Sequence, residues 1–233
     1  MGIRRIIRKV ILRHQADSDS YIKYLKKIGV TIGKRVTIFE PRKVYIDETR
    51  PFLITIGDDV KITNGVTILT HGYDWNVLAG VYNKVFGSAG KVTIGNNVFI
   101  GFHATILKGV TIGDNVIIGA NSLVNKDIPN NVVVAGNPAK IIMSIEEYYK
   151  KRNLAQFAEA KQIYCSYVER YNKEPTVDLF EEFFWLFWNR NEELPDRFKQ
   201  QMNWHEEYDK TFEIFQTEKP MFESFEEFKE KCK

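Results

Sequence analysis

Aliphatic residues recur at every sixth position in the middle of the chain. Within residues 92–140 this position is occupied by Ile94, Ile100, Ile106, Ile112, Ile118 and Val124. Glycine follows it at Gly95, Gly101, Gly113 and Gly119. A helix repeats about every 3.6 residues and a strand about every 2, so neither explains this period. A period of six is typical of a solenoid of hexapeptide repeats, in which each repeat forms one flat side of a coil and every sixth side chain points into a shared core.

The same pattern occurs earlier in the chain, in two runs. The aliphatic position falls on Ile56, Ile62 and Ile68 in one run, and on Ile32, Ile38 and Val44 in the other. Ile56 lies four complete hexads after Ile32. The two runs are therefore predicted to share one phase, across a poorer hexad at residues 50–55.

The phase breaks after Ile68. A continued phase would place the next aliphatic residue at position 74, whereas the pattern resumes only at Ile94. We predict that residues 74–91, called the excursion loop below, leave the coil as an insertion. They are rich in glycine and carry Trp75, Tyr82 and Phe86. A long loop inside a compact repeat is usually functional or disordered.

Helical patterns flank the repeat. Residues 1–28 are predicted to form a basic amphipathic segment whose apolar stripe, which includes Ile3, Ile7 and Val10, packs against the protein. A weak contact of this segment with an anionic membrane surface is the minority alternative. Residues 29–143 form the predicted solenoid domain. Residues 144–233 form a predicted helical region that opens on a capping box at Ser144 and Glu147. Two further helices are predicted to start alike, at Pro175 and Pro220.

Composition narrows the class of protein. The net charge of the 233 residues is +3, with 19 Lys/Arg against 10 Asp/Glu before Ile145 and 14 against 20 from there on. No nucleic-acid-binding module accompanies the basic residues, so we expect no nucleic-acid partner. The two cysteines are too few for a disulfide scaffold, no run is apolar and long enough to span a membrane, and the charged N-terminus does not resemble a signal peptide. A cytoplasmic protein, with peripheral membrane contact as the minority alternative, is expected.

His71 is the most informative of the four histidines. It closes the last hexad before the excursion loop, in ILTHGYDW, at a rim that can be shielded from water and still reachable. Imidazole has an ordinary pKa of about 6.5 and can accept a proton from a hydroxyl or amine nucleophile at neutral pH. An ordinary loop histidine is the alternative interpretation, which position alone does not exclude.

The run from Ile94 to Ile142 resembles the hexapeptide-repeat acyltransferases, in particular the O-acetyltransferases related to the maltose, galactoside and capsular-sugar enzymes. The resemblance covers residues 25–143 and leaves residues 144–233 unexplained. It implies a mainly β fold, namely a left-handed parallel β-helix, to which the helical patterns described above add an N-terminal helix and a C-terminal α-helical extension. It also implies a homotrimer with acetyl-CoA in clefts between adjacent solenoids.

The same resemblance implies roles for particular residues. His71 matches the family's general base, which would activate an acceptor hydroxyl for direct attack on the acetyl thioester. The main chain of Phe102 and Ala120 would face the pantetheine arm. The implied coenzyme contacts also include Asn125, Lys126 and Lys140, the last near the nucleotide phosphates. Tyr73, Asp74 and Trp75 would shape the acceptor pocket, with Asp74 as an alternative partner for the imidazole. Met143 stands where relatives often carry a second basic residue.

The expected function is acetyl transfer to a hydroxyl of a sugar or surface polysaccharide, and three alternatives remain open. The first is N-acetylation of an amino-sugar nucleotide. The second is a zinc hydratase of the γ-carbonic anhydrase kind, which needs three histidine ligands, whereas the solenoid holds only His71 and His103. The third is a non-catalytic or ice-binding solenoid. It should carry flat, regular threonine ladders and no aromatic loop, whereas no single column is followed by Thr63, Thr67, Thr93, Thr105 and Thr111.

Overall fold

The computed structural model describes residues 13–233, which divide into two compact units. The first, called the coil unit, ends at Tyr148, and the second, called the helical unit, is Tyr149–Lys233. The predicted apolar stripe of the N-terminal segment lies outside the described residues. Among the residues that the structure describes, no helix combines the length and apolar character needed to cross a bilayer.

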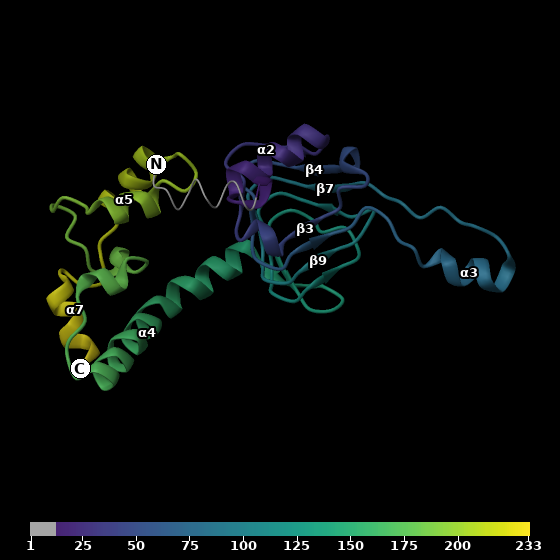
Figure 1. Ribbon diagram of the computed structural model, residues 1–233. Coiled ribbons are helices and arrows are strands. Elements are labelled where there is room, and N and C mark those ends of the chain that lie inside the picture. The colour runs from purple at the N-terminus through teal and green to yellow at the C-terminus, as the bar shows by residue number, and fades with distance from the viewer. Residues whose placement is uncertain (1–12) are drawn as a thin grey trace. The chain divides into compact units, whose positions relative to one another are not determined.

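The coil unit is a stack of coils whose sides are very short strands (Figure 1). Sheet A contains β1 (Thr31–Ile32), β4 (Ile54–Ile56), β7 (Val92–Ile94) and β10 (Thr111–Ile112). Sheet B contains β2 (Thr37–Ile38), β5 (Lys61–Ile62), β8 (Val98–Ile100), β11 (Val116–Ile118), β13 (Val132–Ala135) and β14 (Lys140–Ser144). Sheet C contains β3 (Tyr45–Ile46), β6 (Thr67–Ile68), β9 (Thr105–Ile106) and β12 (Leu123–Val124). All pairings are parallel except β13 with β14, so the chain visits the three sheets in turn, as the predicted solenoid requires.

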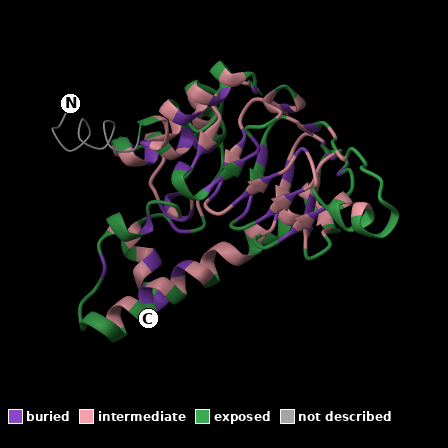
Figure 2. Cartoon of the chain, turned by 45° about the vertical axis from the view of Figure 1, so that its right-hand side comes forward, coloured by how far each residue is buried: buried purple, intermediate pink, exposed green. Residues whose placement is uncertain are grey.

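The register explains the period of six. Thr93 pairs with Thr111, which lies three hexads further along the chain, so a regular coil has three sides of one hexad each. The aliphatic residue of each side is buried, and Ile62, Ile68, Ile100, Ile106 and Ile118 are all 0% exposed. Figure 2 shows this buried interior as purple segments along the strands. The repeat is therefore a continuous core that no single coil could bury alone.

The corners between sheets A and B are built as predicted from paired Asp and Asn residues. The second member of each pair adopts the left-handed conformation, with φ of 60° at Asp59, 54° at Asn97 and 56° at Asn115. The first member accepts a backbone N–H from the coil below, as Asp114 Oδ1 does from Asn96 N at 2.6 Å. Side chains thus link successive corners.

The phase predicted for the first coil is confirmed at Ile32 and Ile38 and wrong at Val44. Thr31 pairs with Thr55, a full four hexads away, whereas the separation between Tyr45 and its partner Thr67 falls short of four hexads. The aliphatic position of β3 is therefore Ile46, and Val44 precedes it in the turn. Two 3₁₀ turns, Pro41–Lys43 and Pro51–Leu53, lengthen the connections before and after β3. Together the added residues equal one hexad in length. The sequence pattern therefore read them as one poorer repeat.

The prediction that five threonines follow no single column is confirmed, because Thr93 pairs with Thr111 on sheet A and Thr67 pairs with Thr105 on sheet C. Sheet A nevertheless carries a longer series. Thr31, Thr55, Thr93 and Thr111 pair in succession on sheet A and form one ladder. They occupy the middle, outward position of each side, where a β-branched residue suits a strand. One of the two criteria for a non-catalytic solenoid is therefore met.

The ends of the stack are covered differently. Helix α2 (Ser18–Ile28) starts at Asp17, whose side chain accepts a hydrogen bond from Ser20 N, and ends at Gly29 with φ 115°. Its Tyr21 and Leu25 are buried in the same core as the first coil. At the other end β14 folds back on β13, with a bulge between Val133 and Val134. Exposed core at the ends of a solenoid is thereby avoided.

The helical unit has a separate aromatic core. The unit contains most of α4 (Ile145–Tyr171), then α5 (Asp196–Met202), α6 (Tyr208–Thr217) and α7 (Phe225–Cys232). Phe180, Phe187, Phe198, Phe215 and Phe228 are all 0% exposed. In the chain as a whole the described α-helices hold more residues than the strands, so the description "mainly β" is wrong. The coil sides contribute only short strands, while this unit is helical.

The predicted helix starts are confirmed at one place and wrong at two. The capping box before α4 forms, with Glu147 N donating to Ser144 Oγ at 3.1 Å and Ser144 N donating to Glu147 Oε2 at 2.7 Å. No α-helix begins at Pro175; two 3₁₀ turns, Val177–Phe180 and Phe184–Leu186, follow instead. α7 begins at Phe225 and not at Pro220, because Ser224 supplies the capping side chain.

Candidate functional site

His71 lies at the base of the excursion loop and contacts a buried carboxylate. Its Nδ1 is 2.5 Å from Oδ2 of Asp47. The His71 side chain is 9% exposed and that of Asp47 is 0% exposed. A carboxylate on Nδ1 holds the proton on that nitrogen, so the basic lone pair is on Nε2. The pair can therefore accept a proton at Nε2 while Asp47 fixes the ring and stabilises its charged form.

Asp47 is held in its charged form by the residues around it. Its Oδ1 accepts from Thr49 N at 3.0 Å and from Thr49 Oγ1 at 2.7 Å. Its Oδ2 accepts from Thr70 N at 3.1 Å and from Thr70 Oγ1 at 2.5 Å. Burial by itself raises the pKa of the Asp47 carboxyl, but the hydrogen bonds from Thr70 and Thr49 outweigh it and hold the pKa well below its usual range.

The excursion loop leaves the coil through a short antiparallel neck. His71 forms an isolated bridge with Ala89, Gly72 N donates to the carbonyl of Ser88 at 3.1 Å, and Gly90 N donates to the carbonyl of Thr70 at 2.9 Å. Across the loop Ile54 pairs with Val92, a separation longer than the three hexads of a regular coil. The neck fixes the backbone of His71, and the loop beyond it carries a short helix, α3 (Trp75–Tyr82), at the end of an arm (Figure 1).

Of the three predicted acceptor residues, Tyr73 contacts His71 and Trp75 lies near Tyr73. The Tyr73 ring meets the imidazole edge-on, with centroids 4.7 Å apart, and Trp75 lies 6.4 Å from Tyr73. Tyr73 is 65% exposed, so its ring is available to a ligand. Asp74 is exposed at the start of α3, and Asp47, not Asp74, orients the imidazole.

The predicted coenzyme residues occupy two different corners of the coil. Phe102 and Ala120 lie where sheet B passes to sheet C, and Asn121 N donates to the carbonyl of Phe102 at 2.7 Å. Lys140 is at the same corner, next to Ala139, whose N–H donates to the carbonyl of Leu123. The other two residues, Asn125 and Lys126, directly follow β12 at the opposite edge of sheet C, the edge that also bears His71. All five are exposed, and one chain does not bring the two groups together.

The sequence analysis missed Asp47. Its backbone N–H donates to the carbonyl of Ile68, which places it beside Leu69 and the residues leading to His71. The correct phase of the first coil would have shown this, since Asp47 directly follows Ile46. The wrong assignment of Val44 to the aliphatic position moved Asp47 out of that column.

His103 is exposed at the corner between sheets B and C, with φ 57°, and its ring covers Gly65. It is therefore at a different corner from His71. Among the described residues, no group of three metal-binding side chains converges.

Comparisons with known proteins identify the family. Residues 91–126 match the family model described as bacterial transferase hexapeptide (six repeats). Protein CapG of Staphylococcus aureus is 44% identical over 128 residues, which span 54% of this chain and 73% of that protein. Galactoside O-acetyltransferase of Escherichia coli strain K12 is 44% identical over 104 residues, 43% of this chain and 50% of that protein.

Solved structures include a galactoside acetyltransferase in complex with coenzyme A. It is 30% identical, with 63% of this chain and 82% of that chain covered and a TM-score of 0.42. The CapG match is long and similar enough to decide the family. The chain belongs to the bacterial hexapeptide-repeat transferases, on the branch of the acetyltransferases. The predicted family and enzyme class are confirmed.

Proposed function

We propose that the protein is an acetyl-CoA-dependent O-acetyltransferase that acetylates a hydroxyl of a sugar or surface polysaccharide. The observation that carries the proposal is the 2.5 Å contact between His71 Nδ1 and the fully buried Asp47, at the base of an aromatic loop. A relative of this chain is named galactoside O-acetyltransferase, which supports a saccharide acceptor. The loop and the pair distinguish this chain from a non-catalytic solenoid in spite of its threonine ladder.

In the proposed mechanism His71 is the general base. Nε2 takes the proton of the acceptor hydroxyl as its oxygen attacks the thioester carbonyl. The carbon–sulfur bond then breaks, and the coenzyme A thiolate leaves and recovers the proton from the imidazolium. Asp47 stabilises that imidazolium and holds the ring. Because the hydroxyl attacks the thioester directly, no covalent acyl-enzyme is needed. Tyr73 and Trp75 offer aromatic faces to the acceptor ring.

The proposed assembly is a homotrimer of left-handed coils in the cytoplasm, with the coenzyme between copies. The two corners that carry the predicted coenzyme residues lie apart in one chain, so a second copy is needed to bring one of each together. The excursion loop also presents apolar side chains to solvent. They are Val77 at 65% exposed, Val81 at 65%, Tyr82 at 69% and Val85 at 70%. Exposed apolar surface of this kind marks a contact with another molecule.

The test is release of coenzyme A thiol from acetyl-CoA in the presence of a panel of neutral sugars, oligosaccharides and an amino-sugar nucleotide. His71→Ala is expected to lower kcat/KM by about 10²–10⁴-fold, the usual contribution of a general base. His205→Ala, an exposed histidine of the helical unit, is the matched control and keeps normal turnover. Near-normal turnover in His71→Ala would remove His71 as the base, and acetylation of the amino-sugar alone would replace the hydroxyl acceptor by an amine.

A further inference from the structure

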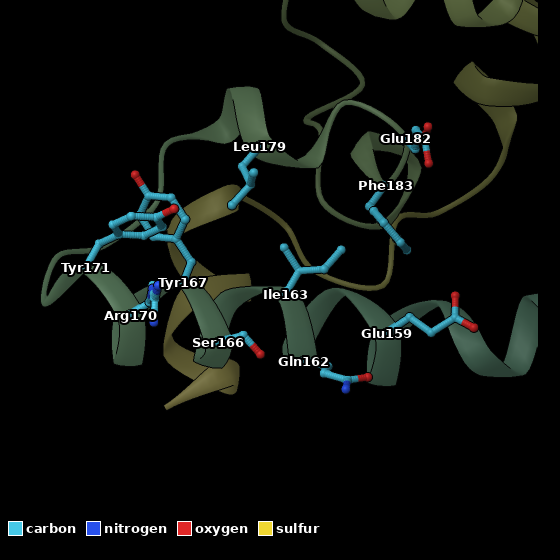
Figure 3. A pocket seen from close by; sticks show the side chains of 10 residues that line it. All are labelled: Glu159, Gln162, Ile163, Ser166, Tyr167, Arg170, Tyr171, Leu179, Glu182 and Phe183. Carbon is cyan, nitrogen blue, oxygen red and sulfur yellow. The ribbon is translucent and has the colours of Figure 1, made fainter.

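The helical unit contains a groove that the chemistry at His71 does not use. It has a volume of about 630 Å³ and lies between the second half of α4 and residues 179–183 (Figure 3). Side chains spaced three or four residues apart on α4 share one face, so the groove runs along the helix. Residues 159–171 extend over about 18 Å at the rise of an α-helix, room for more than one sugar ring.

One end of the groove is aromatic. The rings of Tyr167 and Tyr171 are 4.7 Å apart at 51°, and Tyr171 is 60% exposed. An aromatic ring left this exposed beside a groove offers a flat apolar face and a hydroxyl to a ligand. Leu179 and Phe183 line the wall opposite α4, with Phe183 toward the other end (Figure 3).

Polar side chains lie between the aromatic ones. Gln162, Ser166 and Arg170 line the groove from α4, and Glu182 lines it from the opposite wall (Figure 3). Together they supply amide, hydroxyl, guanidinium and carboxylate groups, which donate to and accept from neighbouring hydroxyls. Alternating ring faces and hydrogen-bonding groups fit the two faces of a pyranose, which are apolar, and its rim, which is polar.

The charges of the lining nearly cancel. Glu159 accepts two hydrogen bonds from Arg152, both at 2.6 Å, so its charge is compensated. The remaining charged lining residues are Arg170 and Glu182, one positive and one negative. A nucleic acid or another polyanion needs an excess of cations, which this groove lacks. A helical peptide needs a continuous apolar groove, which Gln162 and Ser166 interrupt.

We propose that this groove binds a neutral saccharide segment of the acceptor, away from the hydroxyl that reacts. The proposal rests on the proposed saccharide acceptor and adds a second binding site for it. A polymer that occupies both sites gains effective concentration at the reacting site, whereas a monosaccharide cannot.

The first test is binding of the full-length His71→Ala protein to an array of neutral oligosaccharides of increasing length, with hexuronate oligomers and polyuridylate as anionic probes. We expect binding to neutral oligosaccharides that strengthens with length. Tyr171→Ala in the same background is expected to bind about tenfold more weakly, the scale of one lost aromatic contact. Tyr149→Ala, which removes an equally exposed tyrosine of α4 outside the groove, keeps full binding.

The second test is kinetic. In the otherwise intact enzyme Tyr171→Ala should raise KM for a long acceptor about tenfold, with kcat and the KM of a monosaccharide unchanged. The proposed saccharide site would be overturned by binding to anionic probes only or by no neutral ligand on the array. An equal loss of oligosaccharide binding in Tyr149→Ala would overturn it as well. Saccharide binding without any acetyl transfer would keep the groove and reject the proposed function, so the two failures are distinguishable.

Discussion

At the scale of single residues, the buried carboxylate of Asp47 makes the stability of the fold depend on pH. Four hydrogen bonds from Thr49 and Thr70 and the contact with His71 all favour the charged form. Because these bonds exist only in the folded protein, the pKa of Asp47 is lower in the folded state than in the unfolded chain. Such a group stabilises the fold above the ordinary carboxyl pKa of about 3.9 and loses that contribution as the pH falls below it.

We therefore predict that Asp47→Asn lowers the free energy of unfolding near pH 7, and that its difference from wild type narrows between about pH 5 and pH 2. The asparagine does not titrate and offers one acceptor oxygen where the carboxylate offers two. Urea unfolding at several pH values measures the difference. Asp74→Asn, which changes an exposed carboxylate, should show no comparable narrowing. A gap for Asp47→Asn that stays constant with pH would contradict the prediction.

The sequence alone could point to His71 but not to its partner. His71 was found because it stands at the only large break in the hexad phase. Asp47 was not, because its place beside Leu69 depends on the register of two short turns, and a period of six does not report register. Tyr73 and Trp75 were predicted as acceptor residues because they are close to His71 in the chain. Contacts between coils, unlike contacts along the chain, required the structure.

At the scale of the elements, the coils approach one another so closely that glycine is required at some positions. A Cβ on Gly101 would lie 2.7 Å from the backbone nitrogen of Ala120 and from the carbonyl oxygen of Ile118. These are backbone atoms in the next coil, which hydrogen bonds such as Gly101 N to the carbonyl of Ile118 hold in place. A glycine such as Gly101 that follows an aliphatic residue therefore reflects coil-to-coil distance, not a turn that needs positive φ.

We predict that Gly101→Ala destabilises the coil unit by about 1–3 kcal/mol, the usual cost of forcing an added methyl group into a packed interior. The matched control is Gly87→Ala in the excursion loop, where a Cβ would meet nothing within 4 Å. Its stability should stay within about 0.5 kcal/mol of wild type or rise slightly. Thermal melts of both variants measure the contrast, and equal melting temperatures would refute the close-packing argument.

How far the sequence predicts each element depends on whether a local pattern or tertiary packing determines it. The coil core was predictable because one inward residue per side gives a strong period. The helix starts were less so. Ser144 and Glu147 form a local hydrogen-bonded pair that the sequence can reveal. The segment after Pro175 instead packs Phe180, Phe184 and Phe187 into one core and forms 3₁₀ turns in place of an α-helix. Tertiary packing determines the conformation of that segment, and it leaves no recognisable pattern in the local sequence.

At the scale of the whole molecule, the described residues 13–233 form two hydrophobic cores that share no residue. The core of the coil unit is aliphatic and grows by one layer per coil. The core of the helical unit is dominated by aromatic rings, such as Phe184 stacked on Phe198 at 4.6 Å. We therefore expect each unit to have a stability of its own, so that a single free energy of unfolding does not describe the protein.

The last prediction follows from these two cores. Calorimetry of the full chain should resolve two unfolding transitions. Phe228→Ala, which empties part of the aromatic core, should lower one of them by about 3–5 kcal/mol in stability and leave the other within error. Ile118→Val, which removes one methyl group from the coil core, should lower the other by about 0.5–1.5 kcal/mol. If either variant shifts both transitions equally, the two units unfold as one and the assignment of separate stabilities is wrong.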